Sequence, residues 1–174
     1  AIATPTDFLG INYYSRAIIR SDKVAEADNA AREITEPPKD ELTDMGWEVY
    51  PDGLYDTLLR LSRDYGAKRI FITENGAAYP DQPADDGAVR DSLRQEYFES
   101  HLAACHRAIA DGAPLAGYFA WSLLDNFEWA EGYLKRFGLV HVDYDTQVRT
   151  IKDSARWYAT LIANNALPAG GTHV

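Results

Sequence analysis

The chain has 174 residues, of which 46% are hydrophobic and 25% are charged, a composition typical of an ordinary globular protein. Asp and Glu outnumber Lys and Arg by 27 to 17, and the resulting net charge of −10 disfavours nucleic acid as a partner, because phosphate binding needs a clustered basic surface. No apolar run approaches the roughly 20 residues of a membrane span, so we expect no membrane partner either.

The first predicted strand lies in Asp7–Ser15, a short apolar run that ends in polar and aromatic residues. Asn12 and Tyr14 are two residues apart, so an extended strand would place both side chains on one face. The polar residues 21–43, which include Pro37-Pro38, interrupt the apolar pattern. We interpret residues 21–43 as a loop excursion near the mouth of a site rather than as a linker between domains.

A turn-rich segment with Trp47 and then a predicted helix follow this excursion. An aromatic residue in such a segment is either a wall of a binding site or a contact for a lid, and we favour the binding wall for Trp47. The sequence predicts a helix after Pro51, Asp52 and Gly53. Its apolar residues recur at helical spacing at Leu54, Leu58, Leu61 and Tyr65.

The run from Arg69 to Thr73 predicts a buried strand that stops on Glu74, next to a glycine turn. Strict alternation along the strand puts Ile70, Ile72 and Glu74 on one face. A carboxylate after two isoleucines is costly to bury unless it is hydrogen-bonded or used. Catalytic groups gather at the carboxyl ends of strands in barrels and open α/β sheets, so Glu74 is a candidate catalytic residue. The alternative is a strand-ending glutamate that turns into solvent.

A second helix begins with apolar residues at helical spacing, namely Val89, Leu93, Tyr97 and Phe98. His101, Cys105 and His106 on this helix suggest a metal site. However, Cys105 falls on the apolar stripe Phe98, Leu102, Cys105 and Ile109, which favours a small buried hydrophobe. We therefore predict no metal and no cofactor. One cysteine excludes an intrachain disulfide and suits a reducing compartment, so we expect a cytoplasmic protein.

The third predicted strand spans Ala116–Leu124 and is followed by a segment rich in aromatic and acidic residues, which includes Glu128 and Trp129. Trp121 shares a strand face with Phe119 and Leu123, so it is a core residue by this pattern alone. Carboxylates and amides bind sugar hydroxyls, and indoles stack on the C–H faces of pyranose rings. Strand ends that carry such groups therefore suggest a carbohydrate site.

The chain closes with a predicted short strand in 138–144 and a last helix after Thr150, whose side chain could cap it. The inner stripe of this helix is Ile151, Ala155, Tyr158 and Ile162, and residues 168–174 form a frayed tail. Alternating strands and helices predict an α/β fold, and we assign residues 1–174 to one domain.

Three separate motifs in the right order resemble the C-terminal part of a glycoside hydrolase family 1 β-glucosidase. They are Asn12-Tyr13-Tyr14, Thr73-Glu74-Asn75-Gly76, and the block that runs from Trp121 through Phe127-Glu128-Trp129 to Gly132-Tyr133-Leu134-Lys135-Arg136-Phe137-Gly138. The resemblance covers nearly the whole chain. It implies about strands 6 to 8 of a (β/α)₈ TIM barrel, with no cofactor.

The resemblance also implies the roles of individual residues in a retaining glycosidase. Glu74 would be the nucleophile, oriented by a hydrogen bond from Tyr14. The residues that would bind substrate are Asn12 beside the reacting sugar, Trp47 as a wall for the leaving group, Trp121 as the floor of the sugar subsite, and Glu128 and Trp129 on the outer hydroxyls. Because members that act on 6-phosphorylated sugars carry a smaller residue at the Glu128 position, Glu128 implies an unphosphorylated β-glucoside or oligosaccharide.

The chain departs from the family pattern in one respect that matters for catalysis. No Asn-Glu-Pro motif, which carries the general acid/base in the family, occurs in the sequence. A (β/α)₈ barrel takes about 250 residues, so we expect a complementing N-terminal barrel segment to supply the acid/base glutamate. The alternatives are a non-catalytic carbohydrate-binding pseudoenzyme and an inactive fragment. The aglycone, the choice among glucose, galactose and fucose, and the oligomeric state stay open.

Overall fold

The computed structural model describes residues 4, 6–17 and 42–167. The predicted loop excursion at 21–43 lies outside the described residues except for its last two, and the predicted tail at 168–174 lies outside them entirely. In the part of the chain that the structure describes, no helix is long and apolar enough to cross a membrane.

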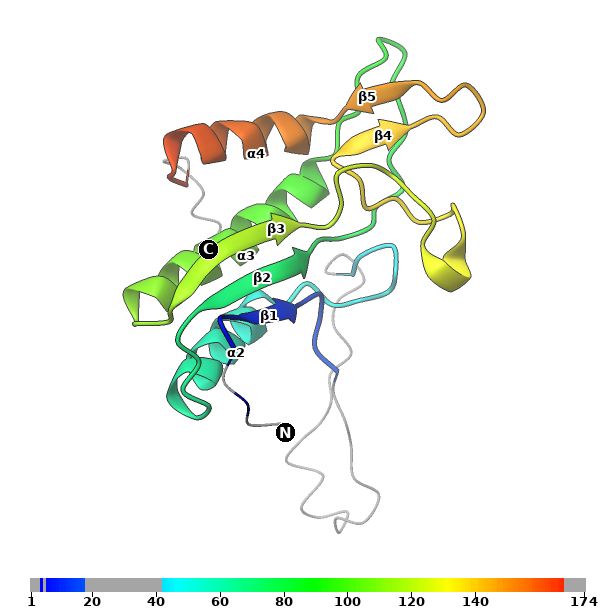
Figure 1. Cartoon of the computed structure of the whole chain (residues 1–174). Coiled ribbons are helices and arrows are strands. Elements are labelled where there is room, and N and C mark those ends of the chain that lie inside the picture. The colour runs from blue at the N-terminus through cyan, green and yellow to red at the C-terminus, as the bar shows by residue number, and fades with distance from the viewer. Residues whose placement is uncertain (1–3, 5, 18–41, 168–174) are drawn as a thin grey trace, which may run out of the picture.

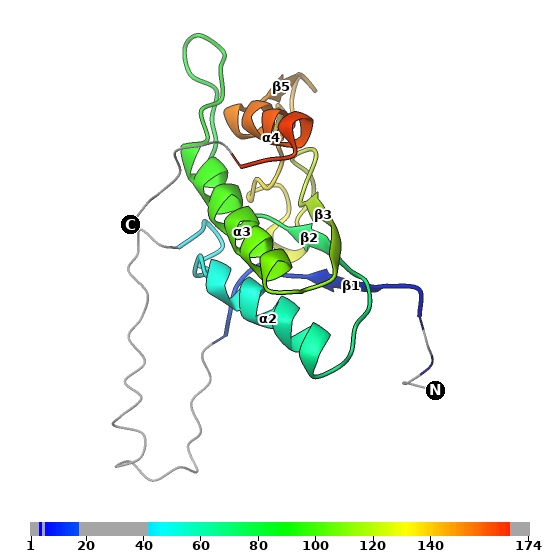
Figure 2. The same ribbon diagram turned by 90° about the vertical axis from the view of Figure 1, so that its left-hand side faces the viewer.

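A parallel three-stranded sheet forms the centre of the chain, with its strands in sequence order (Figure 1). The strands are β1 (Leu9–Asn12), β2 (Ile70–Asn75) and β3 (Leu115–Ala120). Helix α2 (Pro51–Arg63) precedes β2, and helix α3 (Ser92–Ala110) joins β2 to β3. Both helices lie on the same face of the sheet (Figure 2). This alternation confirms the predicted α/β fold.

A smaller layer follows β3 and carries the end of the described chain. It contains the 3₁₀ turn η2 (Trp129–Glu131), the antiparallel pair β4 (Val140–Val142) and β5 (Arg149–Ile151), and helix α4 (Asp153–Asn164). The predicted strand at 138–144 corresponds to β4. The predicted cap at Thr150 is wrong, because Thr150 lies within β5 and Lys152 precedes α4 without a side-chain cap.

The main core lies between the sheet and the two helices that cover it. Ile70 and Ile72 of β2 are fully buried against Leu54 and Leu58 of α2 and against Cys105 of α3. The leucine spacing in α2 and the apolar character of Cys105 therefore have the structural role predicted from the sequence. A second cluster, of Ala77, Tyr79, Tyr97, Phe98 and Leu139, joins α3 to the segments that follow β2 and β3.

Several residues of the predicted helical stripes are exposed rather than buried, and the stripes are wrong at those positions. They are Tyr65, Leu93, Ile109, Ile151 and Ile162. Tyr65 lies beyond the end of α2, Ile151 belongs to β5, and the others lie in the first or last turns of their helices. A periodic pattern defines a face, but that face is buried only where another element covers it.

The face of the sheet opposite the helices carries a row of aromatic rings. Phe8 contacts Phe71 with ring centroids 5.2 Å apart, and Phe71 lies 6.5 Å from Phe119. Phe8 and Phe119 are both more than half exposed. Within the described residues, β1 and β3 each pair on one side only. Open edges and exposed apolar rings together mark this face as a surface that favours further contacts.

Candidate active site

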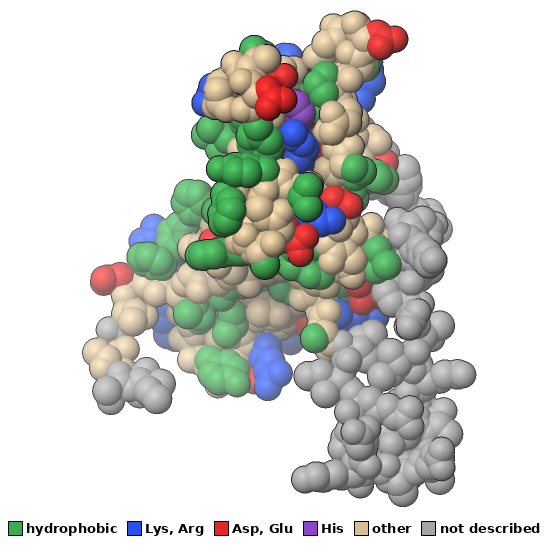
Figure 3. Space-filling view, turned by 90° about the vertical axis from the view of Figure 1, so that its right-hand side faces the viewer, with side chains coloured by type: hydrophobic (Ala, Val, Ile, Leu, Met, Phe, Trp, Pro, Cys, Tyr) green, Lys and Arg blue, Asp and Glu red, His purple; other side chains and the backbone are tan. Residues whose placement is uncertain are grey.

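The site forms where the chain leaves the three parallel strands, at their carboxyl ends. Backbone hydrogen bonds join these exits, from Tyr13 N to Glu74 O at 3.0 Å and from Trp121 N to Asn75 O at 2.8 Å. Gly76 permits the second contact, because a Cβ at this position would stand 1.8 Å from the Trp121 carbonyl oxygen. On the face toward which these strand ends point, acidic and basic side chains lie among hydrophobic ones (Figure 3).

Glu74 is half-buried near the end of β2, and its position departs from strict alternation. The fully buried site at the tip of the strand is taken by Asn75, not by Glu74. The pairing register shifts between Ile11 and Asn12 on one side of β2 and between Ile72 and Asn75 on the other. The prediction that Glu74 shares the face of Ile70 and Ile72 is therefore wrong, because an irregular register re-aims side chains at a strand end.

Tyr14 follows β1 and donates a hydrogen bond from its hydroxyl to Glu74 Oε2 at 2.6 Å. Burial raises the pKa of Tyr14 well above its ordinary value, and the hydrogen bond and the negative charge of Glu74 raise it further. The phenol therefore stays protonated and acts as a donor to the carboxylate. Glu74 is not a glutamate turned freely into solvent, since one of its oxygens accepts a hydrogen bond from Tyr14, which follows the neighbouring strand.

Trp121 and Glu128 approach the same place from the segment after β3. Burial raises the pKa of Glu128, a hydrogen-bond interaction with the Trp121 side chain opposes this shift, and the charge of Glu74 adds to it. Glu128 also contributes to the raised pKa of Tyr14. The structure thus brings Tyr14, Glu74 and Glu128 within interaction range of one another, and Trp121 interacts with Glu128.

Trp47 packs against the ring of Tyr14. The two rings meet edge to face with centroids 5.5 Å apart, and Trp47 also contacts Phe137 at 6.2 Å. Hydrogen bonds to the backbone of Asp44 fix this turn, since Asp44 N donates to Ala78 O at 2.9 Å and Lys135 Nζ donates to Asp44 O at 2.6 Å. Trp47 is therefore part of the wall that holds the Tyr14 ring.

Asn12 and Trp129 are the two predicted site residues that are less closely joined to the others. Asn12 is exposed at the end of β1, and its Oδ1 accepts a hydrogen bond from Thr73 Oγ1 at 2.6 Å. Trp129 opens η2 with 83% of its surface exposed. Among the described residues, the Trp129 ring makes no ring–ring contact with Tyr14, Trp47 or Trp121. Any use of Trp129 in binding needs a ligand that reaches this exposed position.

A buried group of three cations and three carboxylates, here called the ionic cluster, anchors the segment that carries Trp121 and Glu128. Its members are Asp81, Asp91, Arg94, Asp125, Arg136 and Lys152. Asp125 accepts hydrogen bonds from Lys152 Nζ at 3.0 Å, Arg136 Nη1 at 2.6 Å and the backbone N of Gly138 at 2.9 Å. Burial opposes ionisation of Asp125, but Lys152 and Arg136 outweigh it and lower the pKa of this carboxyl.

Sequence reasoning missed the ionic cluster and three hydrogen-bonded residues below Glu74, which are buried Asn75, buried Tyr97 and half-buried Tyr118. The sequence pattern places Tyr97 only on an apolar stripe, and its helical spacing carries no sign of a hydrogen-bonding role. The one available signal was Asn75, an amide at the end of an apolar strand. Such a group needs partners if it is buried.

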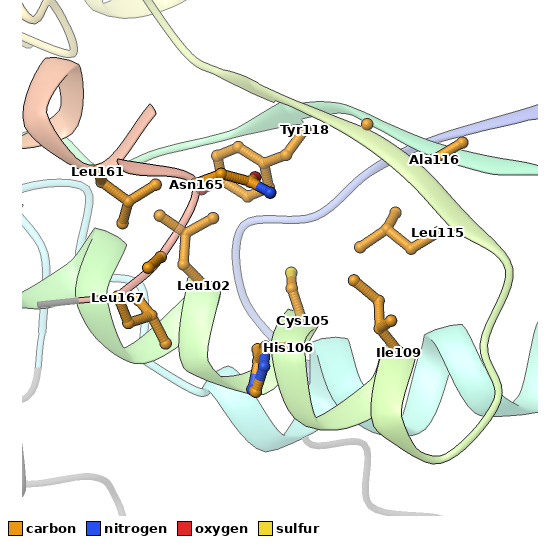
Figure 4. A pocket seen from close by; sticks show the side chains of 12 residues that line it. Leu102, Cys105, His106, Ile109, Leu115, Ala116, Tyr118, Leu161, Asn165 and Leu167 are labelled. Atoms are coloured by element: carbon orange, nitrogen blue, oxygen red, sulfur yellow. The ribbon is translucent and has the colours of Figure 1, made fainter. Parts of the chain in front are cut away.

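Two other features of the chain lie away from this site. No group of three or more His, Cys, Asp and Glu side chains that could hold a metal ion occurs among the described residues. An open apolar groove of about 290 Å³ lies between α3, β3 and the end of α4 (Figure 4). Leu102, Ile109 and Leu161 are among its lining residues, and it contains none of the predicted site residues.

Known proteins match the chain over almost its whole length. The family described as Glycosyl hydrolase family 1 matches residues 1–167. Beta-glucosidase A of Acetivibrio thermocellus is 51% identical over 165 residues, which are 94% of this chain and 36% of that protein. Beta-glucosidase A of Thermotoga maritima is 48% identical over 161 residues, which are 92% of this chain and 35% of that protein. The chain thus spans about a third of the length of these curated relatives.

Solved structures agree with the sequence comparison. The family 1 β-glucosidase from Thermotoga maritima superposes with a TM-score of 0.85 at 46% identity, over 94% of this chain and 36% of that one. A second structure of the Thermotoga maritima enzyme, in complex with glucoimidazole, superposes with a TM-score of 0.82. The family match and the superposition together establish that the chain belongs to glycosyl hydrolase family 1 and forms a partial segment of its α/β barrel fold.

Proposed function

We propose that this chain supplies the nucleophile and the sugar subsite of a retaining β-glucosidase. The observation that carries the proposal is the 2.6 Å hydrogen bond from Tyr14 to Glu74 at the carboxyl end of β2. It is supported by Trp121 and Glu128, which interact beside this pair. The curated relatives named above are β-glucosidases, and the chain covers about a third of their length.

In the proposed reaction, a Glu74 carboxylate oxygen attacks the anomeric carbon of a β-glucoside. The bond from that carbon to the leaving oxygen breaks, its electrons stay on the oxygen, and a general acid donates a proton there. Water then attacks the same carbon, gives up a proton to the same group as base, and releases Glu74 with net retention. The Tyr14 hydroxyl donates a hydrogen bond to Glu74 Oε2 and so holds the Glu74 carboxylate in one orientation during both steps.

Glu128 and Trp121 serve in this proposal as sugar ligands. A carboxylate accepts hydrogen bonds from hydroxyl groups, and an indole offers an apolar surface for the C–H face of a pyranose. A sugar phosphate would meet the negative charge of Glu128, so an unphosphorylated glucoside is the better substrate. Asn12, Trp47 and Trp129 complete the proposed subsite, with Trp47 next to the leaving group.

The proton donor belongs, in this proposal, to a complementing N-terminal barrel segment. The described strands would correspond to about strands 6 to 8 of the closed barrel. The open edges of β1 and β3 and the exposed rings of Phe8 and Phe119 supply a surface against which further strands can pack. Hereafter, the assembled protein means this chain together with such a segment, either its own or that of a family relative such as Beta-glucosidase A of Acetivibrio thermocellus.

Trapping of the covalent intermediate tests this function. The assembled protein is incubated with a 2-fluoro-β-glucoside that has an activated leaving group, digested, and mapped by mass spectrometry. We expect one added fluoroglucosyl group on the peptide with Glu74, no adduct in Glu74→Gln, and a normal adduct in the control Glu99→Gln on α3. An adduct on another residue would remove the assignment. Glucose binding without any adduct or aryl-glucoside turnover would instead favour the carbohydrate-binding pseudoenzyme.

A further inference from the structure

A neutral hydrogen-bonded cluster of buried Asn75, buried Tyr97 and half-buried Tyr118 lies directly below the pair formed by Tyr14 and Glu74. We propose that Tyr97, held by Asn75, is a positioning residue that sets the place of the Tyr14 hydroxyl against Glu74. Tyr97 itself does not touch the reacting atoms. This inference rests on the proposed function, in which Glu74 is the nucleophile.

Asn75 is the centre of this cluster and is completely buried. Its Nδ2 donates to Tyr13 O at 2.7 Å and to Tyr97 Oη at 2.9 Å, and its Oδ1 accepts a hydrogen bond from the hydroxyl of Tyr118. Both amide hydrogens and the amide oxygen are therefore used. Asn75, the residue next to Glu74, thus connects β2 to α3, to β3 and to the segment after β1.

The direction of these hydrogen bonds follows from the number of protons available. Tyr97 has one hydroxyl proton and donates it to Tyr14 O at 3.1 Å, so its oxygen is left to accept from Asn75. Tyr118 donates its own proton to Asn75 Oδ1. Only one orientation of the Asn75 amide satisfies every member, which makes the cluster a rigid support.

The backbone of Tyr13 and Tyr14 depends on this support because it lies beyond the end of β1 at Asn12. The Tyr13 carbonyl oxygen accepts a hydrogen bond from Asn75, and the Tyr14 carbonyl oxygen accepts one from Tyr97. In addition, Tyr13 N donates to Glu74 O at 3.0 Å. The Tyr14 hydroxyl stands at the far end of a long side chain, so a small backbone rotation moves it by a larger distance. Tyr97 is the member of the cluster that holds the Tyr14 carbonyl directly.

The cluster also keeps the same hydrogen-bonding pattern over a wide pH range. Burial raises the pKa values of Tyr97 and Tyr118 above the ordinary value of a tyrosine. His101 stacks on the Tyr97 ring with centroids 3.9 Å apart, and burial lowers the pKa of His101 to about 4. The groups around Asn75 are therefore neutral near pH 7, and they hold Tyr14 without adding a charge next to Glu74.

The test compares Tyr97→Phe with the matched control Tyr118→Phe in the assembled protein. Each variant loses one buried hydroxyl, but only the first loses the bond to Tyr14 O. With an activated aryl β-glucoside, we expect Tyr97→Phe to lower kcat/KM per titrated active site by about 10- to 100-fold, because small misplacements of reacting groups have effects of this size. Glucose inhibition stays within about twofold.

Tyr118→Phe should lower kcat/KM by less than about fivefold, because Tyr118 contacts Asn75 and supports Tyr14 only indirectly. A double-mutant cycle adds a second criterion. If Tyr97 acts through Tyr14, Tyr97→Phe has no further effect on kcat/KM in a Tyr14→Phe background, whereas a merely structural loss adds to it. Equal effects of the two phenylalanine variants, or additive effects in the cycle, would overturn the proposal.

A crystal structure of assembled Tyr97→Phe gives a readout that does not need turnover. We expect the Tyr14 Oη to Glu74 Oε2 separation to rise from 2.6 Å to beyond hydrogen-bond range, roughly 3.5 Å. An unchanged separation would contradict positioning by Tyr97, whatever the activity of the variant. Absence of any Glu74 adduct in the unsubstituted protein would instead contradict the proposed function, so the two failures are distinguishable.

Discussion

Glu74 and Glu128 interact with each other, but the chain supports them with two different kinds of chemistry. Below Glu74 lies the neutral cluster of Asn75, Tyr97 and Tyr118. The segment with Glu128 is anchored by the ionic cluster, in which Asp125 joins Lys152 to Arg136. Buried ion pairs are costly to desolvate and depend on every partner, whereas neutral hydrogen bonds fix geometry without a net charge. Ion pairs thus hold the loop that carries Glu128, while neutral hydrogen-bonded groups lie below Glu74.

The largest expected effect comes from removing the carboxylate that the neutral cluster supports. We predict that Glu74→Gln in the assembled protein lowers kcat for an aryl β-glucoside by about ten-thousandfold or more, a scale seen when covalent nucleophiles are removed. Under the proposed roles, Glu128→Gln should lower kcat/KM by only about 10- to 100-fold, because it would remove hydrogen bonds to the sugar and keep the proposed nucleophile. Steady-state kinetics on both variants check this. Equal losses would mean that the two carboxylates do not have distinct roles.

Breaking the ionic cluster should affect stability more than any change in the neutral cluster. Asp125→Asn leaves the buried Lys152 and the partly buried Arg136 without one carboxylate, so we expect a loss of about 3–5 kcal/mol in the free energy of unfolding. The exposed Asp145→Asn should change it by less than about 0.5 kcal/mol. Urea unfolding of the assembled protein measures both. A small loss for Asp125→Asn would show that the cluster is not a structural anchor.

The pH dependence of the free energy of unfolding tests whether His101 is buried in its neutral form. Its folded pKa of about 4 lies below the unfolded value of about 6.5. The neutral form is favoured in the folded state, so stability is lost as the pH falls from 6.5 to 4, by a total of about 3 kcal/mol. Urea unfolding at several pH values should show a shallower pH dependence in His101→Gln than in the exposed control His106→Gln. Identical slopes would contradict burial of a neutral His101.

The smallest expected effect belongs to the exposed tip of the loop. Trp129→Ala should change the free energy of unfolding by less than about 0.5 kcal/mol, because the side chain is 83% exposed and packs against little. If Trp129 binds the sugar as proposed, KM for the glucoside rises about tenfold with kcat nearly unchanged, the pattern for uniform binding. Chemical denaturation and steady-state kinetics measure the two quantities. A normal KM would remove Trp129 from the subsite.

Local sequence patterns predicted those elements whose burial follows from their own periodicity. Leucine spacing identified α2, and the isoleucine run identified β2, because both pack their apolar faces on the same core. The helix ends were predicted less well. Leu93 and Ile109 lie on the predicted stripe but outside the covered part of α3, and no pattern within a helix tells where its cover stops.

The sequence by itself determined the α/β alternation, the strand that carries Glu74, and the motifs that indicated the family. Only the tertiary structure decided which carboxylate oxygen Tyr14 holds and which side chains lie below it. The register shifts at the tip of β2 place Asn75, rather than Glu74, in the buried position. The partners of Asn75 are far apart in the chain, as are those of Asp125. Hydrogen-bonded clusters of this kind depend on three-dimensional contacts that hydrophobic periodicity does not encode.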